Sequence, residues 1–82
     1  MVIRMNDQYL EFVLAQAKIV FTRTDITPET RFKEDLNAKS LSIAQLMNAI
    51  EDEYDVEVPY MEFKRKETIA DAAAYAAELA EE

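Results

Sequence analysis

Hydrophobic residues recur at helical spacing in three separate stretches of the chain. The first runs from Gln8 to Phe21, the second from Ser40 to about Glu53, and the third from Thr68 almost to the C-terminus. Apolar positions three and four residues apart lie on one face of an α-helix, so each stretch predicts a helix with one buried face. The expected buried residues are Leu10, Val13, Leu14, Ala17 and Phe21 in the first, Ile43, Leu46, Met47, Ile50 and Tyr54 in the second, and Ile69, Ala72, Ala73, Ala76, Leu79 and Ala80 in the third.

Residues that commonly cap helices stand near each predicted start. Asn6 is expected to cap the first helix, and Thr68 the last, where it begins a T-x-x-D capping signature. Ser42 begins an S-x-x-Q capping box and competes with Ser40 for the cap of the second helix. A serine at a helix start is usually a cap, so the pattern alone leaves open whether either serine carries chemistry.

Residues 22–39 show no sustained hydrophobic period and predict a long connection between the first two helices. Thr27 followed by Pro28 can start one short helical turn, since proline suits the first helical position. Phe32 and Leu36 are expected to anchor the connection to the core, because an untethered segment of this length is unusual in a compact domain.

The segment DVEVP, residues 55–59, predicts an extended joint, since no other strand signal exists to pair with it and the residue before proline avoids the helical conformation. The following residues, 60–67, are expected to form a short helical turn that buries Met61 or Phe63. Without glycine in the chain, the left-handed conformation at helix ends is expected at Asn37, Asn48 or Asp55.

Together these elements predict one all-α domain over residues 1–82. Its architecture is a bundle of three main helices plus one short helix, with a long loop between helices one and two. A domain of 82 residues buries only ~60% of the surface that its unfolded chain exposes, so a deep catalytic cleft is not expected.

The charge balance limits the classes of partner. Seventeen acidic and nine basic residues give a net charge of −8, which repels phosphate backbones and anionic lipid headgroups. Nucleic acid is therefore excluded as a partner, and basic protein surfaces are favoured.

Asp7, Glu11 and Lys18 interrupt the first apolar stretch, so we expect no signal peptide and no membrane insertion. We therefore expect a cytoplasmic protein, which we take to be a monomer.

The chain contains neither cysteine nor histidine. This removes disulfides, a thiolate nucleophile, an imidazole base and the usual zinc ligands. We therefore expect that the chain is not itself an enzyme, and that any chemistry depends on a group supplied from outside.

Two charged groups allow more than one interpretation. The first, an acidic group at and after the end of the second predicted helix, could form a calcium site. It lacks the glycine and the alternating ligands of an EF-hand loop, so no metal site is expected. A solvated face that steers basic partners fits it better. The basic trio Lys64, Arg65 and Lys66 is interpreted as a solvated rim that balances nearby acids. The acidic group consists of Glu51, Asp52, Glu53, Asp55 and Glu57.

Residues from about Phe32 to Leu79 resemble the acyl carrier protein family. The hallmark of that family is a loop ending in Asp-Leu-Gly-x-Asp-Ser-Leu, followed by an acidic helix and an Ile-Pro-like joint. Thr30 and Phe32 resemble the family's loop anchors, and the first helix matches by length and pattern only. The residues that match the hallmark are Asp35, Leu36, Ser40, Leu41, Glu51, Tyr54, Val58 and Pro59.

The resemblance implies that Ser40 receives a 4′-phosphopantetheine group from coenzyme A, and that acyl groups are carried as thioesters on its terminal thiol. Ser42 then remains the internal cap. A helix start suits a phosphodiester, because unpaired N–H groups and the positive end of the helix dipole face it. The arm also supplies the thiol that a chain without cysteine lacks.

Further site residues follow from the same resemblance. The implied partners are a phosphopantetheinyl transferase and acyl-loading and acyl-transfer enzymes with basic docking surfaces. The residues expected to contact them are Lys39, Leu41, Ala44, Gln45, Asn48, Glu51 and Asp52. The residues expected to shelter the acyl chain inside the bundle are Leu46, Ile50, Phe63 and Ile69.

The chain departs from the family pattern beside the serine. Lys39 stands where the motif has an acid that is associated with the transferase's magnesium site, and Asn37 replaces the motif glycine. With Tyr60, Met61 and the basic trio after Pro59, these changes suggest a specialised carrier for a dedicated lipid or secondary-metabolite pathway. An aminoacyl or peptidyl carrier, and a helical interaction module that has lost cofactor loading, remain as alternatives.

Overall fold

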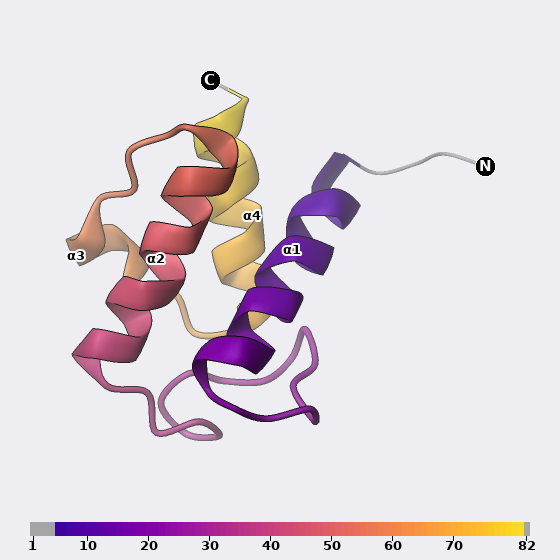
Figure 1. Ribbon diagram of the computed structural model, residues 1–82, viewed down its shortest axis with the longest axis vertical. Helices are drawn as coiled ribbons and strands as arrows, with labels where there is room; N and C mark the ends of the chain where they lie inside the picture. The colour runs from indigo at the N-terminus through magenta and orange to yellow at the C-terminus, as the bar shows by residue number, and fades with distance from the viewer. Residues whose placement is uncertain (1–4, 82) are drawn as a thin grey trace.

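The computed structural model describes residues 5–81, with side chains from Gln8 onward, and confirms the predicted all-α architecture. The helices are α1 (Met5–Val20), α2 (Ser40–Tyr54), α3 (Tyr60–Phe63) and α4 (Ile69–Ala80). Figure 1 shows α1, α2 and α4 as a bundle, with α3 at its side and the long connection crossing one end. No helix in this part of the chain is both long enough and apolar enough to cross a membrane.

The core lies between α1, α2 and α4, as the hydrophobic periodicity predicts. α1 packs against both α2 and α4. The small side chains of α4 allow the backbones of α1 and α4 to approach closely. Val13, Leu46, Ile50 and Ile69 are fully buried. Four buried residues were not among those that the sequence predicted to be buried: Tyr9, Ile26, Val58 and Ala77.

The helix ends confirm some of the expected caps and contradict others. The Thr68 hydroxyl accepts a 3.1 Å hydrogen bond from the Asp71 backbone N–H, as its capping signature predicts. Asn6 lies inside α1, so its assignment as a cap was wrong. Asn37 and Asp55 have positive φ angles of 49° and 54°, whereas Asn48 lies within α2.

The connection between α1 and α2 is anchored as expected, and backbone pairing holds it as well. The Phe32 ring is buried, and Leu36 packs against the core. The Phe32 N–H donates to the Glu67 carbonyl at 2.9 Å, and the Ile69 N–H donates to the Thr30 carbonyl at 3.1 Å. These bonds form an isolated β-bridge that ties the connection to the segment before α4.

The shorter connections also agree with their sequence patterns. Residues 56–59 form no helix, Pro59 has an extended backbone, and the segment leads into α3, where Phe63 is buried and Met61 is 60% exposed. Of the two residues proposed to be buried there, Phe63 is the one that enters the core. Pro28 and Glu29 form a turn rather than a helix, closed by a 3.0 Å hydrogen bond from Thr30 N–H to the Thr27 carbonyl.

Candidate functional site

Ser40 is the first residue of α2, and its side chain is exposed to solvent. The N-cap is Lys39, which has an extended backbone (φ −99°, ψ 164°) and makes no side-chain capping bond. Ser42 is the third residue of the helix and does not cap it, so the predicted capping box was wrong. The first turn of α2 therefore starts without a side-chain cap and presents a serine hydroxyl beside its N-terminus.

A tight turn positions Ser40 at the helix start. The Ala38 N–H donates to the Phe32 carbonyl at 2.8 Å, and Asn37 takes the left-handed conformation that glycine often provides. The Asp35 carboxylate accepts a 2.8 Å bond from the Arg31 backbone N–H. This bond and the nearby Arg31 guanidinium lower the pKa of the Asp35 carboxyl below its ordinary value.

Arg23 reinforces this turn from the start of the connection. Its guanidinium donates to the Asp35 carbonyl at 3.0 Å and pairs with Asp25 at 2.7 Å. The family motif identifies Asp35 but not Arg23, because the two residues lie twelve positions apart and no local period links them. Arg23 is thus a positioning residue for the Ser40 turn that the sequence pattern did not reveal.

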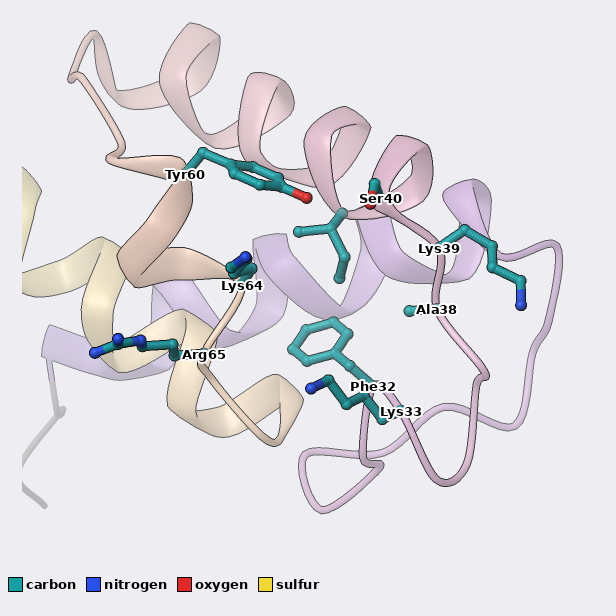
Figure 2. Close-up of a pocket in the computed structure, with 9 residues that line it drawn as sticks. Phe32, Lys33, Ala38, Lys39, Ser40, Tyr60, Lys64 and Arg65 are labelled. Atoms are coloured by element: carbon teal, nitrogen blue, oxygen red, sulfur yellow. The ribbon is translucent and has the colours of Figure 1, made fainter.

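A cavity of about 260 Å³ opens beside Ser40; we call it the Ser40 cavity. Figure 2 shows the Tyr60 ring reaching across from α3, with its hydroxyl toward Ser40. The lining residues are Phe32, Lys33, Ala38, Lys39, Ser40, Ile43, Tyr60, Lys64 and Arg65. Phe32, one of the two side chains that anchor the connection, thus also lines this cavity.

The expected partner-contact residues on α2 are exposed along one side of the helix. Leu41 is 70% exposed, and Gln45, Asn48 and Asp52 are also exposed. These positions follow one another at intervals of three and four residues, which places them on one face. Ala44 is half-buried, and Lys39 is exposed at the N-cap. Their role in partner binding stays a prediction.

Glu51 has a structural role that the sequence analysis did not anticipate. It is half-buried, and its carboxylate accepts a 2.8 Å hydrogen bond from the backbone N–H of the buried Val58. This bond ties the extended joint before α3 to the end of α2. Among the described residues, no group of three or more His, Cys, Asp or Glu side chains could hold a metal ion.

Replacing Glu51 by alanine should lower the free energy of unfolding by about 1–3 kcal/mol, because the buried Val58 N–H would lose its charged acceptor. Urea denaturation measures this loss. Glu53→Ala is the matched control, since Glu53 is exposed in the last turn of α2, where removal of an acid should be neutral or slightly stabilising. Equal effects of the two changes would show that the Glu51 bond does not stabilise the joint.

The four residues expected to shelter an acyl chain meet in the bundle interior. Leu46, Ile50, Phe63 and Ile69 are all in the same buried cluster, each 2% exposed or less. None of these four residues lines the Ser40 cavity, but Phe32 and Ile43 belong both to the cavity lining and to the buried cluster. Acyl binding between these four side chains stays a prediction, and the cavity adjoins the core through Phe32 and Ile43.

The comparisons with known proteins identify the family of the chain. The phosphopantetheine attachment site family matches residues 13–76, which include Ser40, the whole of α2 and α3, and most of α4. The chain belongs to the acyl carrier protein family. It is 41% identical over 51 residues to the acyl carrier protein of Helicobacter hepaticus, an alignment that covers 62% of this chain and 67% of that protein.

Members of the acyl carrier protein family bear a covalently attached 4′-phosphopantetheine, and this chain is such a carrier. The residues around Ser40 fit that group. The hydroxyl is exposed at a helix N-terminus that has no side-chain cap, and lysine side chains line the adjoining cavity. A phosphodiester here would be stabilised by the helix dipole and the first-turn N–H groups, and the bound arm supplies the thiol that carries an acyl group.

Proposed function

We propose that residues 1–82 form a single carrier domain that holds acyl intermediates as thioesters on a 4′-phosphopantetheine arm attached to Ser40. The observation that carries the proposal is the place of Ser40. Ser40 is the first residue of α2, is exposed, and lies inside the region that matches the family. No side chain caps the start of this helix. Electrostatic stabilisation of an anion at such an exposed site contributes roughly 0.3–1 kcal/mol.

The distribution of side chains supports presentation of the cargo to partner enzymes. The exposed face of α2 carries Leu41, Gln45, Asn48 and Asp52 beside the attachment site. The net charge of −8 favours encounter with basic docking surfaces on a phosphopantetheinyl transferase and on acyl-loading and acyl-transfer enzymes. We expect these enzymes to meet a monomeric carrier in the cytoplasm.

The carrier itself is not an enzyme in this proposal. It has no histidine or cysteine, so partner enzymes must provide the base for each transfer step. Lys39 at the N-cap and the basic residues after α3 support a specialised lipid or secondary-metabolite pathway rather than general service. An aminoacyl or peptidyl carrier would use the same attachment chemistry and would differ from an acyl carrier in the group that its thiol carries.

Hydroxylamine lability of a loaded acyl group tests this proposal. The chain is incubated with hexanoyl-coenzyme A, magnesium and a broad-specificity transferase, and its intact mass is measured before and after hydroxylamine treatment. We expect a gain of one hexanoyl-phosphopantetheine, of which hydroxylamine removes only the acyl part. Failure to gain mass with any transferase would support an interaction module that has lost cofactor loading, and an acyl group resistant to hydroxylamine would exclude a thioester.

A further inference from the structure

The Ser40 cavity is surrounded by positive charge. Four of its nine lining residues are basic, namely Lys33, Lys39, Lys64 and Arg65, and no carboxylate lines it. We call these four residues the basic rim. This local excess contrasts with the net charge of −8 of the chain, so a solvated surface of average composition does not account for it.

The basic rim is not neutralised by ion pairs among the residues that the structure describes. The salt bridges in that part of the chain belong to Arg23 and Arg31, outside the rim. Glu34, which lies next to Lys33 in sequence, pairs with the Arg31 guanidinium at 2.6 Å. Glu34 and Glu67 line a neighbouring hollow with Lys33, Lys64 and Arg65 but form no ion pair with them, so these cations can pair with a ligand.

The cavity combines this charge with an apolar wall. Phe32 and Ile43 are buried side chains that line it, and the Tyr60 hydroxyl adds a hydrogen-bond donor. Figure 2 shows Lys39 extending away from the cavity and Arg65 pointing away from Ser40, whereas Lys33 and Lys64 lie on the Phe32 side. The Lys64 ammonium lies 5.9 Å from the centre of the Tyr60 ring, so these two side chains are neighbours.

The volume of the cavity limits what can enter. At about 260 Å³ it is smaller than the pockets of ~300–1,000 Å³ that hold drug-sized ligands. It suits a short acyl group with an anionic end better than a long alkyl chain, since the apolar wall would contact the methylenes and the rim would contact the charge.

We propose that the Ser40 cavity binds the carboxylate end of a short dicarboxylic acyl group carried on this chain's own arm, with Lys33 and Lys64 as its binding residues. The inference rests on the proposed function, because the arm at Ser40 delivers the cargo. A flexible tether beside its own site gives an effective concentration in the mM range, so weak ion pairs are sufficient for occupancy. Like-charge repulsion at the rim selects against an aminoacyl cargo with an ammonium end.

The test compares two cargoes of similar length. Adipyl and hexanoyl groups are loaded from their coenzyme A thioesters, and the rate of hydroxylamine cleavage on the protein is divided by the rate on coenzyme A, which removes intrinsic differences in reactivity. The wild type is compared with Lys33→Glu, Lys64→Glu and the control Lys18→Glu, which makes the same charge change at an exposed position of α1 outside the cavity. Circular dichroism checks that each variant is folded, and Lys64→Gln replaces Lys64→Glu if that variant unfolds.

We expect each rim variant to speed cleavage of the adipyl thioester by about two- to fivefold, the size of one exposed ion pair, and to leave the hexanoyl thioester unchanged. The Lys18 control should affect neither, and 1 M salt should abolish the difference. Equal effects on the adipyl and hexanoyl thioesters would show that the rim holds only the phosphodiester of the arm. No effect on either thioester would show that the rim holds nothing. Either result would overturn the proposal. Absence of loading would instead refute the attachment at Ser40.

Discussion

Phe63→Ala should destabilise the folded chain by about 3–5 kcal/mol, the usual loss for a buried phenylalanine. Phe63 is the one buried residue of α3, and it belongs to the core formed with Leu46, Ile50 and Ile69. Its removal leaves a cavity where α3 joins the bundle. A small domain has a total stability of only about 5–15 kcal/mol, so the loss should be visible as a large shift of the urea midpoint.

Met61→Ala is the matched control for this prediction. Met61 lies on the same short helix but is 60% exposed, so its replacement should change stability by less than about 0.5 kcal/mol. Similar losses for both variants would mean that α3 is held by something other than the Phe63 ring. A second readout addresses the acyl-chain hypothesis, because a hexanoyl group that enters this core should recover part of the stability lost in Phe63→Ala.

Lys39→Asp should speed phosphopantetheine transfer by a general transferase about tenfold, which corresponds to about 1.4 kcal/mol in the barrier. The family motif has an acid at this position, associated with the magnesium site, and Lys39 places the opposite charge next to Ser40. Aspartate is also a preferred N-cap, whereas Lys39 makes no capping bond. The initial rate of mass gain at fixed transferase concentration measures the effect.

Lys39→Asn separates charge from helix capping. Asparagine caps a helix about as well as aspartate but carries no charge, so both variants should gain about 0.5–2 kcal/mol of stability. Only Lys39→Asp should show the increase of about tenfold in the rate of phosphopantetheine transfer. An unchanged rate in Lys39→Asp would show that Lys39 does not restrict modification by general transferases.

The helices were the part of the fold that the sequence could predict well. Each long helix has one face with apolar residues three and four positions apart, and burial of Val13, Leu46, Ile50 and Ile69 follows directly from that spacing. Phe32 and Leu36 were identifiable as anchors because they are the large apolar residues of a polar segment. The start of α2 at Ser40 also agrees with the predicted start of the second helix.

Contacts between residues distant in sequence were not predictable in the same way. The Arg23 bond to Asp35, the Glu51 bond to Val58 and the bridge between Arg31 and Thr68 leave no periodic signal in one chain. The capping box was misassigned because the N-cap of α2 is Lys39, three residues before Ser42. The cavity also escaped prediction, since its lining residues come from the connection, from α2, from the start of α3 and from the segment after α3.

The intact mass of the protein, measured before and after incubation with coenzyme A, magnesium and a broad-specificity phosphopantetheinyl transferase, tests the central claim most directly. Ser40→Ala and Ser42→Ala are treated in parallel, as two equal changes in the first turn of the same helix. We predict a gain of one phosphopantetheine on the wild type and on Ser42→Ala, and none on a folded Ser40→Ala. A gain on Ser40→Ala, or its loss on Ser42→Ala alone, would contradict the assignment of Ser40.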